Sequence, residues 1–184
     1  MRGGYTKESI LSPEEVQEAL DVYHQTPMEK YWQYYNLFKV ERRDITGDIS
    51  NMGFMKTLHK RARTRSQVAQ GYFLRYPPGS FTKVHSDNGS DITIVTLLES
   101  KDLVGGHSLT QGVFEESGRP EGWEAIREES GYNGYGEPIV NDVVDIKDGE
   151  SLCYGPHLLH GVSKVYKGHR IVLVTWWNND TTRN

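Results

Sequence analysis

Short β-type segments bounded by turn residues make up most of the chain from residue 68 onward. Six of them have the length of a strand: VAQGYFLRY, DITIVTLLE, GGHSLTQ, EPIVNDVVDI, ESLCY and HRIVLVTWW. Clusters of Gly, Pro, Asn and Asp separate them, which is typical of strands joined by turns. Several short strands without intervening helices predict a β-sandwich or jelly roll, with any helices packed against one sheet.

The strongest helical signals lie in the N-terminal third. In residues 12–24, Ser12 suits an N-cap, Pro13 suits the first helical position, and apolar residues recur at roughly helical spacing. A second helix is expected over residues 27–38. Its aromatic residues are interpreted as core: Tyr31, Trp32, Tyr34, Tyr35 and Phe38.

The length of 184 residues fits a single domain, 1–184. We expect residues 1–66 to form a helical support and residues 67–178 to form the β core. A loop insertion at about 110–138 interrupts that core, with a helical turn expected around Glu124 to Glu128. Loops of this length in compact domains are often functional lids or disordered segments.

Composition excludes several classes of protein. The formal net charge of −4 gives no overall attraction to nucleic acid, and the basic run HKRARTR (59–65) is expected to be a solvated face or loop. Cys153 is the only cysteine, so an intrachain disulfide cannot form. The sequence contains neither a signal-peptide core nor a membrane-spanning apolar stretch, so a cytoplasmic location without membrane association is expected.

Residues with metal-ligand chemistry occur at two places in the β region. His85 and Asp87 are separated by one residue, so on an extended segment both side chains project from the same side. His157 and His160 both compete to be a third ligand. Two histidines and one carboxylate on one face leave open positions on a metal ion, which suits non-haem Fe(II) and O2 chemistry.

Arg170 begins the apolar strand IVLVTWW. A guanidinium in such a place is costly unless it meets an anion, and its planar fork suits a carboxylate. Taken alone, the residue is better explained by a salt bridge to one of the protein's own acids.

Together these residues form an ordered set. It comprises Tyr76-x-x-Gly79, His85-x-Asp87, Gly105-Gly106-x-x-Leu109, Asp148-Gly149, His160-Gly-Val162, and Arg170 followed by Leu173 and Trp176. The set resembles the 2-oxoglutarate- and Fe(II)-dependent dioxygenases of the prolyl 4-hydroxylase type, and the likeness runs from about residue 70 to residue 178. It implies a mainly β fold with N-terminal helices, a double-stranded β-helix (a cupin-like jelly roll) whose open mouth holds iron.

The resemblance also implies roles for single residues. His85, Asp87 and His160 would be the iron ligands, whereas His157 falls on no family position. Arg170 would bind the far carboxylate of 2-oxoglutarate, and the phenol of Tyr76 would reach the same co-substrate.

One position departs from the family pattern. Relatives often present a tyrosine hydroxyl near the co-substrate carboxylate, where this chain has Leu97. Thr93 lies in phase with Leu97 on the same face, so it is the candidate for an alternative hydroxyl.

The activity implied is hydroxylation of an unactivated C–H bond with O2, succinate and CO2 being co-products and ascorbate a candidate reductant. A carboxylate at Asp87 favours hydroxylation over halogenation. The favoured substrate is a prolyl or other residue in a peptide or protein, with Trp176 and Trp123 as candidate substrate contacts. The alternatives are a free amino acid or other small molecule, a less favoured nucleic-acid demethylase, and a non-catalytic cupin-like module that binds a metal or an anion.

Overall fold

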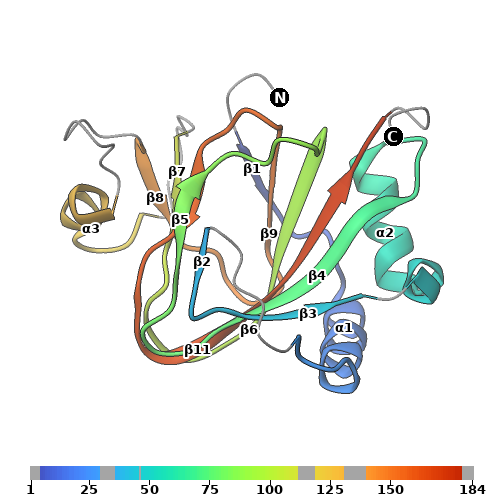
Figure 1. The fold of residues 1–184 in the computed structure, drawn as a ribbon, viewed down its shortest axis with the longest axis horizontal. Helices are drawn as coiled ribbons and strands as arrows, with labels where there is room; N and C mark the ends of the chain where they lie inside the picture. The colour runs from blue at the N-terminus through green and yellow to red at the C-terminus, as the bar shows by residue number, and fades with distance from the viewer. Residues whose placement is uncertain (1–4, 30–35, 46, 112–118, 131–139, 180–184) are drawn as a thin grey trace.

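The computed structural model describes residues 5–29, 36–45, 47–111, 119–130 and 140–179. Its strands form two antiparallel sheets that face each other (Figure 1). In spatial order the large sheet contains β1 (Tyr5–Glu8), β9 (Ser151–Tyr154), β6 (Ile92–Gly105), β11 (Val165–Trp177), β4 (Val68–Tyr76) and β3 (Glu41–Asp44). The small sheet contains β2 (Leu37–Phe38), β5 (Phe81–His85), β10 (His160–Val162), β7 (Ser108–Thr110) and β8 (Asp142–Val144). The expected jelly roll is thus confirmed.

The two longest strands, β6 and β11, form the centre of the large sheet. They pair antiparallel from Val165 opposite Gly105 to Trp177 opposite Ile92, with three shifts of register along the way. Figure 1 shows both strands bending at one end toward the small sheet. Gly168 at this bend has φ of +73°, and a Cβ there would lie 2.2 Å from the carbonyl oxygen of Lys101. The sharp turn therefore requires a glycine.

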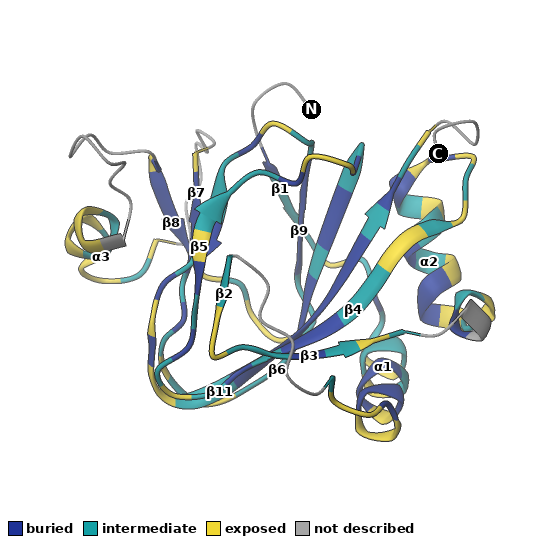
Figure 2. Ribbon diagram, viewed as in Figure 1, coloured by how far each residue is buried: buried dark blue, intermediate teal, exposed yellow. Residues whose placement is uncertain are grey.

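Helix α1 (Pro13–Gln25) matches the expected helix to within a residue at each end. It starts with a capping box, because Ser12 Oγ accepts from the Glu15 amide (3.1 Å) and Glu15 Oε1 accepts from the Ser12 amide (3.0 Å). Figure 1 shows α1 and α2 on the side of the large sheet away from the small sheet. The largest hydrophobic cluster lies between these helices and the large sheet, and Figure 2 shows their buried faces.

Helix α2 (Gly53–Ala62) follows a short 3-10 helix (Gly47–Asn51) and was not expected from the sequence. It contains the first half of the basic run HKRARTR, where Lys60 is exposed as expected of a solvated face but His59 and Arg61 are half-buried. Arg61 pairs with the carboxylate of Glu8, and the ring of His59 stacks on Trp177 with 5.0 Å between centroids. These contacts tie α2 to β1 and β11.

The expected helix over residues 27–38 is also corrected where the chain is described. Residues 27–29 and 36–38 are not helical, and Leu37–Phe38 form β2. Phe38 is 45% exposed and stacks on Phe81, so it is not a core residue. The other four aromatic residues of this segment lie outside the described residues. The N-terminal region also adds β1, β2 and β3 to the sheets, and β1 and β3 pair with β9 and β4 at the two edges of the large sheet.

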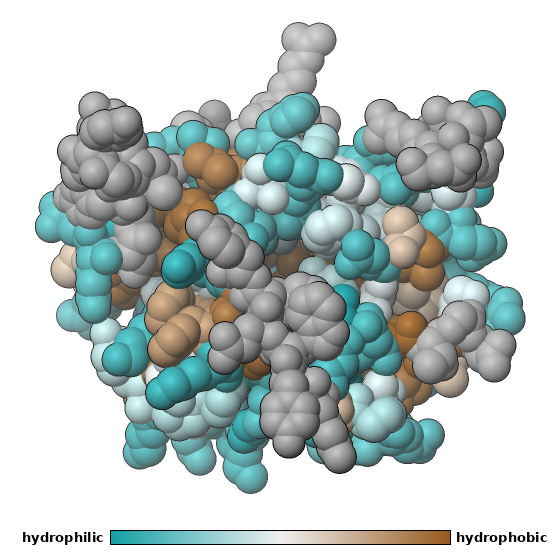
Figure 3. Space-filling model, in the orientation of Figure 1, coloured by the Kyte–Doolittle hydropathy of each residue, from teal (hydrophilic) through white to brown (hydrophobic). Residues whose placement is uncertain are grey.

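The expected helical turn in the insertion is confirmed as α3 (Trp123–Ser130), which packs beside β8. Much of the rest of the insertion lies outside the described residues. On the face in Figure 3, hydrophilic residues make up most of the rim, and hydrophobic ones gather in smaller areas nearer the centre. None of the α-helices in the described ranges is long and apolar enough to cross a bilayer.

Candidate metal centre

Three side chains with ligand atoms meet between the sheets. His85 ends β5, Asp87 follows two residues later, and His160 begins β10 directly opposite His85. Their ligand atoms lie within 4.8 Å of one another. Asp87 Oδ1 is 3.3 Å from Nε2 of His85 and 3.4 Å from Nε2 of His160. One oxygen and two nitrogens therefore converge on one point.

Hydrogen bonds behind the two imidazoles fix their orientation. Nδ1 of His85 lies 2.7 Å from the carbonyl oxygen of Lys83, and Nδ1 of His160 lies 2.9 Å from that of Leu158. A carbonyl oxygen only accepts, so each Nδ1 carries the proton and donates. The lone pair on Nε2 is then free for a metal ion, which is the arrangement usual for ligating histidines.

Asp87 is buried yet held in its charged form. Burial raises the pKa of its carboxyl group, but the facing imidazoles of His160 and His85 lower it further, so the pKa lies well below its usual value. For His85, burial is the largest single influence and lowers the pKa, but Asp87 and the hydrogen bond to Lys83 together outweigh it, so the net shift is upward. The centre thus offers an ionised carboxylate between two imidazoles.

This donor set fits a first-row divalent metal ion. Two histidines and one carboxylate on one face leave other coordination positions open, and this combination is typical of non-haem Fe(II) oxygenases. The residues present therefore fit the iron that the sequence resemblance implies.

Arg170 lies deeper between the sheets, on β11, and is only 3% exposed. Its Nη1 donates to the carbonyl oxygen of Gly106 at 2.6 Å, whereas its buried Nε has no hydrogen-bond partner. No carboxylate of the described chain lies within ion-pair distance, so the salt bridge considered above is not found there. Burial lowers the pKa of the guanidinium. A buried cation of this kind calls for an anionic ligand.

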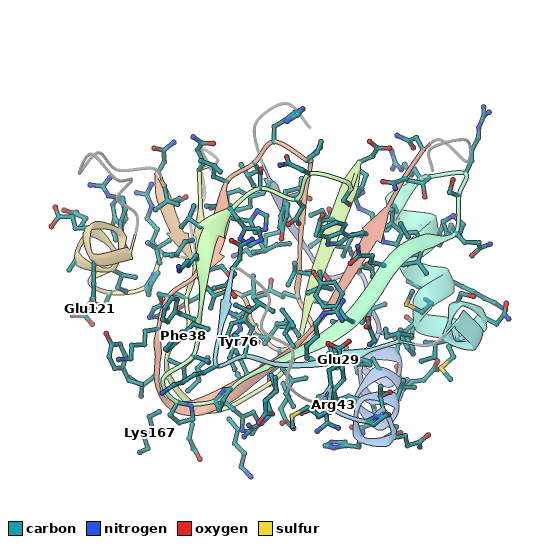
Figure 4. All side chains as sticks on the ribbon, viewed as in Figure 1. Glu29, Phe38, Arg43, Tyr76, Glu121 and Lys167 are labelled. Atoms are coloured by element: carbon teal, nitrogen blue, oxygen red, sulfur yellow. The ribbon has the colours of Figure 1, made fainter. Side chains whose placement is uncertain are left out.

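A single pocket connects Arg170 to the metal cluster. Its other lining residues are Tyr5, Leu37, Tyr72, Leu74, Tyr76, Thr82, Val95, Ser108, Leu109, Thr110, Leu152, Tyr154, Gly161, Val162, Val172 and Val174. Most of its walls are apolar. Tyr76 and Thr82 are both buried there with their hydroxyl oxygens 2.6 Å apart, and Figure 4 shows the labelled Tyr76 between the two sheets. The arrangement suits a small, elongated anion that reaches from Arg170 toward His85, Asp87 and His160.

Thr93 has a partner that was not expected from the sequence. Its hydroxyl donates to Asp87 Oδ2 at 3.0 Å and does not contact Arg170. Alternation along β6 correctly placed Thr93 on the same face as Leu97, but Thr93 lies at the metal end of the pocket. The expected role of Thr93 in binding the co-substrate stays a prediction, and the structure adds a contact between its hydroxyl and a candidate metal ligand.

The remaining candidates fall into two groups. Trp176 lines a second, shallower pocket that also includes His85 and Asp87. Trp123, in contrast, packs on α3 against Leu109 and its neighbours, and the guanidinium of Arg119 lies 3.9 Å from its ring. Figure 1 shows α3 on the outer side of the small sheet, so Trp123 is not at the metal centre. His157 is exposed and is not part of the cluster.

Two tyrosines beside the cluster escaped the sequence interpretation. The ring of Tyr154 lies 4.2 Å from that of His160, and Tyr72 lines both pockets. Both residues occupy strands that were correctly expected, in phase with Leu152 and Leu74 respectively, so alternation along these strands contained the signal. Tyr5 had no comparable signal, because β1 is only four residues long.

Comparison with known proteins yields matches in structure but not in sequence. No family model and no curated protein matches the chain. A prolyl-4-hydroxylase from Pseudomonas putida matches with a TM-score of 0.64 and 12% identity, covering 97% of this chain and 94% of the other. HygX from Streptomyces hygroscopicus, solved with nickel and 2-oxoglutarate bound, gives a TM-score of 0.64 at 15% identity, with coverages of 97% and 84%.

A third structure is a Trichoplax adhaerens prolyl hydroxylase in complex with a peptide fragment of the hypoxia inducible factor oxygen degradation domain. It matches with a TM-score of 0.60 and 14% identity, covering 96% of this chain and 84% of the other. At such identities the likeness establishes architecture. The chain has the jelly-roll fold of the 2-oxoglutarate- and Fe(II)-dependent oxygenases, prolyl hydroxylases among them.

Proposed function

We propose that the protein is a 2-oxoglutarate- and Fe(II)-dependent dioxygenase that hydroxylates an unactivated C–H bond. The observation that carries this proposal is the pairing, in one pocket, of the His85, Asp87 and His160 cluster with a buried Arg170 that lacks a carboxylate partner in the described chain. A dicarboxylate that chelates a metal through one end and meets a guanidinium at the other fits both features.

Separate groups of residues would bind the metal, bind the co-substrate and line the pocket. Nε2 of His85, Nε2 of His160 and Oδ1 of Asp87 would hold Fe(II), which when bound supplies the activation of O2 that the reaction requires. Arg170 would bind the C5 carboxylate of 2-oxoglutarate through charge-assisted hydrogen bonds. Tyr76 and Thr82 would offer hydroxyls along the pocket, and the apolar walls would exclude water. The products would be the alcohol, succinate and CO2.

The substrate that we favour is a prolyl or other residue in a peptide or protein. Two observations support it. The shallow pocket beside the metal ligands includes Tyr72 and Trp176, whose rings suit a proline ring or an extended chain. The Trichoplax protein of the same fold also holds a peptide. A free amino acid or other small molecule remains the alternative substrate, and mass spectrometry of both classes after incubation, searching for one added oxygen, distinguishes them.

Two further proposals concern the chain as a whole. We propose that residues 67–178 form the oxygenase core, because the metal ligands and Arg170 all come from that range. We also propose a cytoplasmic setting, which agrees with Cys153 being a buried free thiol.

Turnover of 2-oxoglutarate tests the activity. The protein would be incubated with Fe(II), O2, ascorbate and 2-oxoglutarate, and succinate would be measured with and without candidate substrates. We expect succinate from the native protein and none above background from His85→Ala. Binding of Fe(II) and 2-oxoglutarate without any succinate would favour the alternative, a non-catalytic cupin-like module. Failure to bind Fe(II) or 2-oxoglutarate at all would contradict both the dioxygenase and the cupin-like module.

A further inference from the structure

The hydroxyl of Thr93 joins the two sheets at the metal centre. Thr93 lies on β6 in the large sheet, between Tyr154 of β9 and Trp176 of β11, and has no exposed surface. Asp87 instead belongs to the turn that follows β5 of the small sheet. The contact of 3.0 Å between Thr93 Oγ1 and Asp87 Oδ2 therefore crosses from one sheet to the other.

The single proton of this hydroxyl has two acceptors within reach. Asp87 Oδ2 lies at 3.0 Å, and Ser90 Oγ lies at 3.1 Å. Ser90 is itself buried and donates its own proton to the carbonyl oxygen of Ile92 at 2.6 Å. An ionised carboxylate is a stronger acceptor than a neutral hydroxyl, so the proton of Thr93 goes to Asp87. The amides of Gly89 and Ser90 bond the carbonyl oxygen of Asp87, which fixes the turn.

The two oxygens of Asp87 are thus placed differently. Oδ1 faces Nε2 of both histidines, whereas Oδ2 faces away from them toward Thr93. The histidines show the same division, because Nε2 points into the cluster while Nδ1 is bonded to a carbonyl oxygen. In each of the three side chains, the polar atom that faces away from the cluster makes a hydrogen bond that fixes the orientation of the side chain.

We propose that Thr93 is a positioning residue that restricts Asp87 to a single metal-ligand oxygen, Oδ1. This inference rests on the proposed function and deepens it. When Fe(II) is bound, His85, Asp87 and His160 would hold it and the 2-oxo acid would chelate it, so a second oxygen from Asp87 would compete with O2 for the metal. By engaging Oδ2, Thr93 would prevent that competition.

Substitution of Thr93 by valine or serine tests the proposal. Thr93→Val keeps the shape of the side chain and removes the donor, whereas Thr93→Ser keeps the donor. The dissociation constant for Mn(II), measured by calorimetry without 2-oxoglutarate, should fall several-fold in Thr93→Val, because the freed Oδ2 becomes a further ligand oxygen, and should return to the native value in Thr93→Ser. The visible absorption of bound Co(II), which weakens as coordination number rises, should fall in Thr93→Val and match the native spectrum in Thr93→Ser.

The matched control is Thr96→Val. Thr96 lies on the same strand with no exposed surface, and its hydroxyl bonds that of Ser151 at 2.7 Å. Its replacement should lower the stability of the fold but leave Mn(II) affinity and the Co(II) spectrum unchanged. Should Thr93→Val fail to fold, Thr93→Ala serves in the same comparison.

Two results would overturn the role of Thr93. One is an Mn(II) affinity that does not increase and a native Co(II) spectrum in folded Thr93→Val, and the other is an equal increase of affinity in Thr96→Val. If the proposed function is wrong, the native protein would bind Mn(II) but form no succinate. The comparison of Thr93→Val with Thr93→Ser would still show whether Thr93 positions Asp87.

Discussion

His85 and His160 lie directly opposite each other across the β5–β10 pair, with their ring centroids 4.5 Å apart. The residue after His160 makes this close pairing feasible. A Cβ on Gly161 would lie 2.8 Å from the carbonyl oxygen of Thr82 and 3.1 Å from the amide nitrogen of Val84, both on β5. The distance between the two imidazoles therefore depends on a glycine.

Gly161→Ala should weaken metal binding without unfolding the protein. The added methyl group meets backbone atoms that cannot rotate away, so β10 must move from β5 and carry His160 with it. We expect the Mn(II) dissociation constant to rise about tenfold or more while circular dichroism stays native-like. Gly89→Ala is the control, because its Cβ would meet only Trp176 at an ordinary 3.6 Å. Unchanged affinity in Gly161→Ala would show that the pairing tolerates a side chain.

Single replacements of the three relevant histidines should separate ligands from a bystander. His85→Ala and His160→Ala each remove one of three ligand atoms, so we expect Mn(II) and Fe(II) binding to be lost in calorimetry. His157→Ala removes an exposed side chain outside the cluster and should leave binding native. Loss of binding in His157→Ala together with native binding in His160→Ala would reverse the assignment.

Arg170 should matter to the co-substrate and not to the metal. Arg170→Ala removes hydrogen bonds from a charged donor, each worth about 1.5–3 kcal/mol, so the concentration of 2-oxoglutarate needed for half-saturation should rise at least 10- to 100-fold. Mn(II) affinity in the absence of 2-oxoglutarate should stay native. A co-substrate requirement that does not change would place the dicarboxylate elsewhere.

Arg170→Met should also leave the ligand-free fold at least as stable as the native one. The native guanidinium is buried without a carboxylate partner in the described chain, and replacing a buried charge by an apolar side chain of similar length is often neutral or stabilising. Urea unfolding measures this directly. A clear loss of stability would mean that Arg170 contributes to folding through its bond to Gly106.

Cys153 should resist alkylation in the folded protein. Its side chain has no exposed surface, and burial raises the pKa of the thiol from 9.0 to about 11. Because only the unfolded thiol ionises readily above pH 9, this group favours unfolding increasingly as the pH rises from about 9 toward 11. Iodoacetamide labelling followed by mass spectrometry should be slow at pH 8 and fast in denaturant. Rapid labelling of native protein at pH 8 would contradict the burial.

Features with local sequence signals could be predicted, whereas those made by distant pairing could not. Ser12, Pro13 and the apolar spacing after them indicated α1, and the strand-length run VAQGYFLRY gave β4 at its observed bounds. Strands β1 and β3 are short and show no clear alternation of apolar and polar residues. They form by pairing with β9 and β4, which lie far away in the sequence. Helix α2 was not predicted, because the basic residues in its C-terminal half were interpreted as a solvated face or loop.

The same limit explains the outcome at the site. Spacing identified His85 and Asp87, and the order of motifs selected His160 from two candidates. The contact of Thr93 with Asp87 was not predicted, because alternation tells which face a side chain occupies and not which neighbour lies above it. Both Trp123 and Trp176 were predicted to contact the substrate because they are tryptophans. The fold places only Trp176 beside the metal ligands.

The anchoring points of the proposed co-substrate lie on opposite sheets. The histidines belong to strands of the small sheet, and Arg170 belongs to the large sheet. A dicarboxylate bound at both ends would therefore connect the two sheets. We expect its binding to slow amide hydrogen exchange in β5, β10 and β11 together. A metal ion without the dicarboxylate should not slow exchange in all three strands, because it has no contact with Arg170.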